Sequence, residues 1–138
     1  STNIDSHKAI PVVLDSQKKL EFFDFSPFKN INSNFVMTAH VLFKKIDPNF
    51  VATQSSLIIN RIIRKKLNFK GLIISDDICM KALKGDLLLN AKKCLLSGCN
   101  LVLYCGGNTK HSSLLLKGIN KIDKFTVKKT QQFYEFLR

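Results

Sequence analysis

Several features are missing from this sequence of 138 residues, and each absence excludes a class of protein. It has no apolar run approaching the roughly 20 residues that a membrane-spanning helix needs. Its mostly polar first residues do not resemble a secretory signal, and no initiator methionine opens it. Internal repeats and Pro- or Gly-rich linkers are also absent. With 45% hydrophobic residues, we expect one soluble globular domain, or part of one, without a membrane partner.

Acidic residues are scarce, since 10 Asp and Glu stand against 22 Lys and Arg, for a net charge of +12. Such a balance suits nucleic acid only when the basic side chains gather in one stripe. Here they come as scattered pairs, which are Lys18–Lys19, Lys44–Lys45, Lys65–Lys66, Lys92–Lys93 and Lys128–Lys129. The pattern favours a lysine-rich solvated surface and no nucleic-acid partner, with a basic nucleic-acid-binding module as the alternative.

The four cysteines form no C-x-x-C pair and have no histidines at zinc-ligand spacing. Three of them, Cys94, Cys99 and Cys105, lie in apolar stretches, where a free cysteine behaves as a small buried hydrophobe. The pattern predicts reduced thiols in a cytosol and no metal site. We expect no organic cofactor either.

Three short apolar runs, 34–38, 71–75 and 100–104, read as strands. Their hydrophobicity is continuous, which indicates burial on both faces, as in a parallel sheet covered by helices. Each run is followed by a helical pattern, so the sequence predicts an α/β fold in which parallel strands alternate with helices. The segment 11–14 is a weaker fourth candidate that we do not assign to this set.

Helical spacing marks four segments between and after these strands. In 57–67 an apolar stripe faces inward while Arg61, Arg64, Lys65 and Lys66 cover the other side, and Ser55 or Ser56 can cap the start. In 87–97 we expect an inward face, with Gly98 as the left-handed C-cap; that face consists of Ala91, Leu95 and Leu96. Residues 112–116 and 126–137 also read as helical, and the last helix should dock through Phe133, Tyr134, Phe136 and Leu137.

Candidate chemistry follows the strands, because active sites of α/β sheets lie beyond the carboxyl ends of the strands. The run 71–75 ends in Asp76 and Asp77, which read equally well as a catalytic carboxylate or as a helix N-cap for 78–83. His40 follows the first strand and is more simply a hydrogen-bonded structural residue. Near the N-terminus, Asp5 stands two residues from His7, so its carboxylate can orient that imidazole for proton transfer.

Several of these sequence motifs occur in the same order as in a known protein family. The phrases are Ile4-Asp5-Ser6-His7, Val36-Met37-Thr38-Ala39-His40-Val41, Ile46-Asp47-Pro48, Gly71-Leu72-Ile73-Ile74-Ser75-Asp76-Asp77-Ile78 and Ser97-Gly98-Cys99-Asn100-Leu101-Val102-Leu103. Together they resemble the glycoside hydrolase family 3 β-hexosaminidases of bacterial cell-wall recycling, the NagZ type. The resemblance runs from residue 4 to about residue 108 and implies the C-terminal portion of a (β/α)8 TIM barrel.

The resemblance also implies roles for individual residues. Asp76 is similar in position to the family's nucleophile, and His7 to a proton donor and acceptor that Asp5 orients. The implied reaction removes a terminal β-linked N-acetylglucosamine, with retention, from peptidoglycan fragments carrying anhydro-muramic acid. The implied location is the cytoplasm. Asp77 and His40 are expected to be supporting residues.

The family's members have further strands before the Asp-Ser-His turn, so residues 1–138 are expected to form a partial catalytic domain without its N-terminal half. A barrel cut in this way exposes sheet edges. We therefore expect the chain alone to be inactive, with the missing half supplied by an upstream segment or a separate partner. The alternative is a non-catalytic relic.

Overall fold

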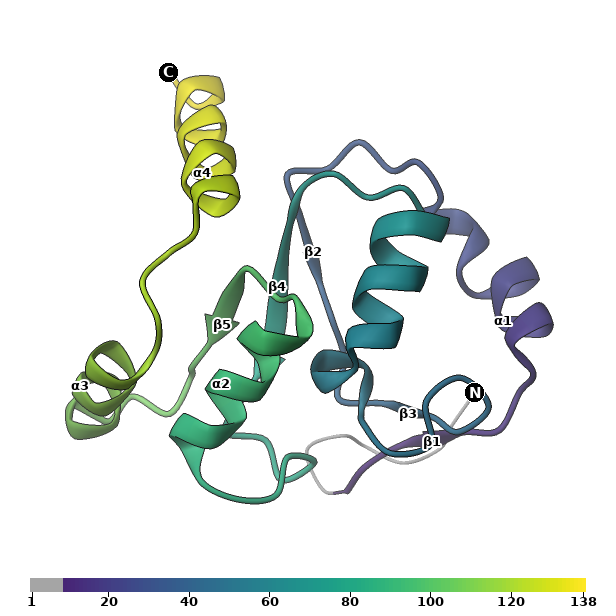
Figure 1. Ribbon diagram of the computed structural model, residues 1–138, viewed down its shortest axis with the longest axis horizontal. Helices are drawn as coiled ribbons and strands as arrows, with labels where there is room; N and C mark the ends of the chain where they lie inside the picture. The colour runs from purple at the N-terminus through teal and green to yellow at the C-terminus, as the bar shows by residue number, and fades with distance from the viewer. Residues whose placement is uncertain (1–8) are drawn as a thin grey trace.

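The structure, a computed structural model, describes residues 9–138 and contains a three-stranded parallel sheet (Figure 1). Its strands are β2 (Phe35–Met37), β4 (Leu72–Asp77) and β5 (Leu101–Leu103), in the order β2-β4-β5. All three apolar runs that predicted strands therefore form strands. The parallel pairing and the intervening helices confirm the α/β fold class.

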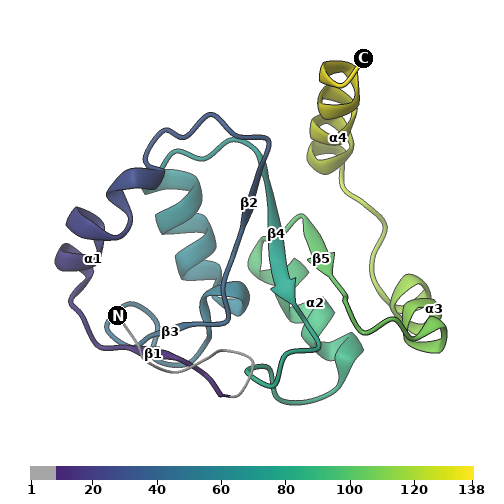
Figure 2. The same ribbon diagram turned by 180° about the vertical axis from the view of Figure 1, so that it is seen from behind.

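The strands are in a register that brings their carboxyl ends to one edge. Phe35 pairs with Leu72, and Asp77 pairs with Leu103, with an irregularity between Ile74 and Asp77 on β4. β4 is the central strand of the three and ends in the two adjacent aspartates. The carboxyl ends of the three strands consequently lie at the same edge of the sheet (Figure 2).

Helices and short turns connect and flank the strands (Figures 1 and 2). They are α1 (Gln17–Phe23), η1 (Ser26–Phe28), η2 (Ala52–Gln54), η3 (Leu57–Lys66), α2 (Leu87–Ser97), α3 (Thr109–Gly118) and α4 (Lys124–Phe136). Between β2 and β4 comes η3, and between β4 and β5 comes α2, so each crossover carries a helix as the sequence predicted. None of the helices within residues 9–138 is long and apolar enough to cross a membrane.

The weaker candidate at 11–14 is a strand of a different sheet. β1 (Val12–Val13) pairs in parallel with β3 (Leu42–Phe43), away from the β2-β4-β5 sheet. β3 was not predicted, because two residues are too few to show a period. β1 contributes Val13 to an apolar cluster with Leu20 and Ile58, against which Phe43 of β3 packs.

Helix η3 is wound as a π-helix, and its amide ladder ends with the N–H of Leu67 donating to the carbonyl of Ile62. The hydroxyl of Ser55 accepts from the N–H of Ile58 at 3.1 Å and caps the start, as predicted. The prediction that Arg64 covers the solvent side was wrong, because its guanidinium turns inward to backbone carbonyls.

Arg64 and Asn100 join the amino ends of β4 and β5. The guanidinium of Arg64 donates to the carbonyl of Gly71 at 2.6 Å and to Oδ1 of Asn100 at 2.6 Å. The same Oδ1 accepts from the N–H of Ile73 at 2.9 Å, while Nδ2 of Asn100 donates to Thr126. Burial lowers the pKa of Arg64, and its polar contacts compensate the desolvated charge. These bonds lie at the end of the sheet opposite the aspartates.

Helix α2 begins and ends where its sequence indicates. The carboxylate of Asp86 accepts from the N–H of Leu89, and Gly98 takes the left-handed conformation at φ 114°. Ala91 is fully buried, but the prediction that Leu96 faces inward was wrong, since its side chain is 79% exposed. Cys94 occupies the buried position instead.

The tail forms two helices, α3 and α4, which confirms the helical prediction for 112–116 and 126–137. The docking face expected on α4 was largely wrong, because Tyr134, Phe136 and Leu137 are all exposed. Phe133 alone of that set packs on the sheet, edge to face with Phe35 at 4.9 Å between ring centroids. The spacing of the aromatic residues predicted a buried face on α4, but most of these side chains are exposed.

Candidate functional site at the carboxyl ends of the strands

Asp76 and Asp77 are half-buried at the carboxyl end of β4. Side chains of successive strand residues point to opposite faces, so the two carboxylates enter different surroundings. Oδ1 of Asp76 accepts from the backbone N–H of Asp77 at 2.8 Å. That bond is local to the strand end, and within residues 9–138 the side chain of Asp76 has no hydrogen bond to β2 or β5.

Asp77 connects two strand ends. Its Oδ1 accepts from the N–H of Cys79 at 3.1 Å and from the N–H of Cys105 at 3.0 Å. A carboxylate that accepts two backbone N–H groups satisfies donors that a turn would otherwise leave unpaired. Of the two alternatives for the pair, Asp77 therefore takes a capping role, although 78–83 forms turns and not the expected helix.

His40 is completely buried beside this segment. Its Nε2 lies 2.9 Å from the carbonyl oxygen of Asp77, and its Nδ1 lies 3.0 Å from Oγ1 of Thr53. Oγ1 of Thr38 in turn lies 3.0 Å from Oγ1 of Thr53. The loop after β2 is thereby hydrogen-bonded to the end of β4.

The direction of this chain of hydrogen bonds follows from its last member. A carbonyl oxygen only accepts, so Nε2 of His40 carries the proton that goes to Asp77. In the neutral ring Nδ1 then accepts from the hydroxyl of Thr53, and Thr53 accepts from Thr38. His40 is thus a hydrogen-bonded structural residue, the simpler of the interpretations that its sequence position allowed. The sequence around His40 did not indicate that Thr53 and Thr38 would belong to its chain of hydrogen bonds.

The loop after β5 contains Cys105, Gly106, Gly107 and Asn108. Gly107 has φ 64°, which favours glycine, and Asn108 caps α3 by accepting from the N–H of Lys110 and of His111. These residues form a tight loop. Cys105, expected to be buried, is exposed here, because its position falls two residues beyond the end of the strand.

Two of the predicted site residues, Asp5 and His7, lie outside the described residues 9–138. Their roles remain predictions. Within the described part of the chain, no group of three or more His, Cys, Asp or Glu side chains could hold a metal ion.

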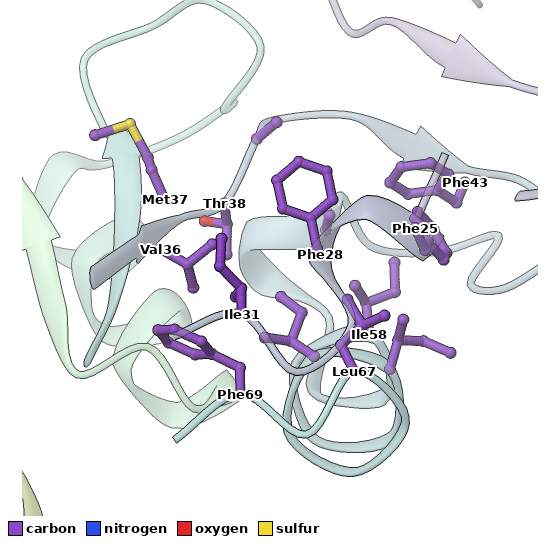
Figure 3. A pocket seen from close by; sticks show the side chains of 14 residues that line it. Phe25, Phe28, Ile31, Val36, Met37, Thr38, Phe43, Ile58, Leu67 and Phe69 are labelled. Carbon is purple, nitrogen blue, oxygen red and sulfur yellow. The ribbon is translucent and has the colours of Figure 1, made fainter. Parts of the chain in front are cut away.

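The molecule also contains an apolar pocket between β2, η1 and η3 (Figure 3). Its lining includes Phe25, Phe28 and Phe69, and the hydroxyl of Thr38 is the one oxygen among the side chains drawn. That hydroxyl already bonds to Thr53. A sugar needs several convergent polar groups, so this pocket does not suit a glycan and we place the candidate site at Asp76.

Comparison with known proteins assigns the chain to a family. Residues 1–132 match the glycosyl hydrolase family 3 N-terminal domain. The chain belongs to this family of glycoside hydrolases.

Among individual relatives, the β-hexosaminidase of Shewanella frigidimarina is 39% identical over 121 residues, which are 83% of this chain and 35% of that protein. The β-hexosaminidase of Psychromonas ingrahamii is 34% identical and covers 97% of this chain and 39% of its own length. The chain thus spans little more than a third of the relatives it matches.

Solved structures share the arrangement of the described elements. CbsA from Thermotoga neapolitana superposes with a TM-score of 0.86 at 28% identity, over 99% of this chain and 35% of that one. NagZ from Neisseria gonorrhoeae, in complex with N-trifluoroacetyl-D-glucosamine, gives a TM-score of 0.79 at 28% identity, over 92% of this chain and 37% of that one. The β2-β4-β5 sheet and its helices are therefore a fold shared with this family.

Proposed function

We propose that residues 1–138 are part of the catalytic domain of a retaining β-N-acetylhexosaminidase in which Asp76 is the nucleophile. The observation that carries the proposal is the position of Asp76 at the carboxyl end of the central parallel strand of a family 3 chain. Asp77 is the less suitable nucleophile, because one of its oxygens accepts two backbone N–H groups.

The chemistry needs two groups with opposite protonation. Asp76 is ionised and attacks the anomeric carbon, while a proton donor protonates the departing glycosidic oxygen. The bond from Asp76 to the sugar forms as the bond to the leaving oxygen breaks. Water then attacks the same carbon, gives its proton to the former donor and releases Asp76, so the configuration is retained.

We assign the proton donor to His7, with Asp5 orienting its ring. Imidazole has an ordinary pKa near neutrality, so it can donate in the first step and accept in the second. A carboxylate two residues away can hold the ring in one orientation. The support is the Asp-Ser-His sequence and its place in the family resemblance.

The proposed substrate is a terminal β-linked N-acetylglucosamine on a peptidoglycan fragment that carries anhydro-muramic acid, processed in the cytoplasm during cell-wall recycling. The names of the relatives support a hexosaminidase. The Neisseria gonorrhoeae structure, named as a complex with an N-acylated glucosamine derivative, supports this sugar class. The reaction as written uses no metal or organic cofactor.

The active protein should contain further strands on both sides of the sheet. Among the described residues, β2 and β5 are the edge strands of the main sheet, and a (β/α)8 barrel has no edges. We propose that the rest of the barrel, from an upstream segment or a separate chain, pairs with these edges and supplies most sugar contacts.

The test is hydrolysis of a chromogenic β-N-acetylglucosaminide by the complete reading frame that contains this chain. Replacing the proposed nucleophile, Asp76→Asn, should lower kcat at least about a thousandfold because no glycosyl-enzyme can form. His7→Ala should lower kcat by about a hundredfold or more on a disaccharide, whose poor leaving group needs protonation. The matched control is Asp24→Asn, which removes an exposed carboxylate on another side of the fold and should leave kcat unchanged.

Proton NMR of the first product should show the β-anomer, as retention requires. Hydrolysis that persists in Asp76→Asn would contradict the assignment of the nucleophile. A folded complete protein without any hydrolysis would favour the relic.

A further inference from the structure

Cys79 and Cys105 occupy equivalent positions, two residues beyond the ends of the neighbouring strands β4 and β5. Asp77 of β4 pairs in register with Leu103 of β5, and each cysteine follows its partner of that pair by two residues. Neighbouring strands lie about 4.8 Å apart, and cysteines with Cα atoms roughly 4.4–6.8 Å apart can form a disulfide. The register thus makes the two positions neighbours just beyond the edge of the sheet.

Hydrogen bonding holds the two residues together beyond the ends of the strands. The backbone N–H groups of both cysteines donate to the same oxygen, Oδ1 of Asp77, at 3.1 and 3.0 Å. The thiol of Cys79 also lies against the backbone N–H groups of Cys105 and Gly106. The Cys79 thiol therefore lies next to the residue that carries the second thiol.

The four free cysteines divide into two accessible and two inaccessible thiols. Cys79 and Cys105 are exposed, whereas Cys94 and Cys99 are buried in the apolar core. Burial raises the pKa of Cys94 to about 11 and that of Cys99 to about 12, so neither forms a thiolate readily. An oxidant in solution meets the first pair and not the second.

We propose that Cys79 and Cys105 are a modification site at which a small disulfide of the glutathione type converts the two thiols into an intramolecular disulfide. The bond would join the turn after β4 to the loop after β5, next to Asp76. The inference is independent of the proposed hydrolysis, since it depends only on the positions of the two thiols.

The exchange balances in two steps. The thiolate of one cysteine attacks glutathione disulfide, forms a mixed disulfide and releases one glutathione thiolate. The thiolate of the other cysteine then attacks the mixed disulfide and releases the second glutathione. The protein loses two protons and two electrons, and glutathione disulfide is reduced to two thiols. Desolvation and, less strongly, the carboxylate of Asp77 raise the pKa of Cys79, so less of its thiolate is present. This suits Cys79 to the second step, because there the mixed disulfide is in the same molecule and at high local concentration.

The experiment uses the 138-residue chain, oxidised with glutathione disulfide, alkylated and digested with trypsin without reduction. Cleavage after lysine places Cys79 alone on peptide 71–81, and Cys105 on peptide 94–110 together with the two buried cysteines. We expect these two peptides to be linked, in protein that remains monomeric on a non-reducing gel. The link should disappear in Cys79→Ser and in Cys105→Ser and persist in the matched control Cys94→Ala.

Three results would overturn the proposal. The first is two glutathionylated cysteines that do not resolve to a linked pair. The second is a link that survives Cys105→Ser, which would place it on a buried cysteine. The third is a disulfide between two copies of the chain. Both exposed positions tolerate serine without loss of core contacts, so unfolding of the variants does not obscure the outcome.

Discussion

At the scale of single residues, adjacent carboxylates at the end of β4 have different partners. The apolar run before Asp76 and Asp77 was enough to predict that both stand at a strand end, where chemistry occurs in α/β proteins. Which of them caps backbone groups was not predictable, because the partners, Cys79 and Cys105, depend on the pairing of β4 with β5. The same holds for His40, whose partners Asp77 and Thr53 lie 37 and 13 residues away.

The buried hydrogen bonds of His40 predict a large effect on stability. His40→Ala would leave the hydroxyl of Thr53 and the carbonyl of Asp77 without this partner in the interior, and it would create a cavity. We expect the free energy of unfolding to fall by about 3 kcal/mol, as measured by urea denaturation.

His111 provides the matched control. It is exposed on α3 and contacts the hydroxyl of Tyr104 at 3.3 Å. His111→Ala should lower the free energy of unfolding by less than about 0.5 kcal/mol. Equal losses in the two variants would show that His40 contributes no more than a surface histidine.

At the scale of helices and strands, the sequence predicted where a helix or strand forms better than it predicted which of its side chains are buried. Continuous apolar runs identified β2, β4 and β5, and Gly98 marked the end of α2, because these signals are local. The exposure of Leu96 and the inward turn of Arg64 were not predictable, since each depends on which elements lie next to the helix. The pair β1 and β3 was missed in part for the same reason.

Gly98, in the turn between α2 and β5, and Gly85, before α2, should differ in how much stability they lose on replacement by alanine. Gly98 has φ 114°, and a Cβ there would lie 2.9 Å from Cγ2 of Ile59. Gly85 has a similar φ of 108° but open space around the same position. Gly85→Ala should therefore lose about 1–2 kcal/mol of unfolding free energy from backbone strain alone.

Gly98→Ala should lose about 1–3 kcal/mol more, because Ile59 is completely buried and has little room to move. Thermal or urea unfolding of the two variants side by side measures the difference. Identical losses would mean that the backbone conformation alone requires glycine at this position.

At the scale of the whole molecule, the exposed surface is both basic and rich in large apolar side chains. Leu96, Leu116 and Phe136 are each more than three-quarters exposed, and the net charge is +12. Exposed apolar surface promotes association. The balance of exposed and buried side chains depends on tertiary packing, so composition alone did not predict it.

Substitutions at two neighbouring leucines of α3 should affect stability and association separately. Leu115 is 8% exposed and Leu116 is 77% exposed. Leu116→Ser should leave the unfolding free energy within about 0.5 kcal/mol and raise the concentration at which the chain stays in solution. Leu115→Ser should cost about 3 kcal/mol because it buries a hydroxyl in the core. A change of similar size in both variants, by urea denaturation, would contradict the assignment of α3's inward face.

The two polar clusters at opposite ends of β4 have a consequence for combining substitutions. Arg64 and Asn100 act at the amino end, whereas Asp77 and His40 act at the carboxyl end. A strand of this length separates the clusters by roughly 16 Å, beyond the distance at which mutational effects usually couple. Losses of unfolding free energy from substitutions at the two ends should therefore be additive. Selection can then raise the free energy of unfolding at one end of the strand while it alters reactivity at the other.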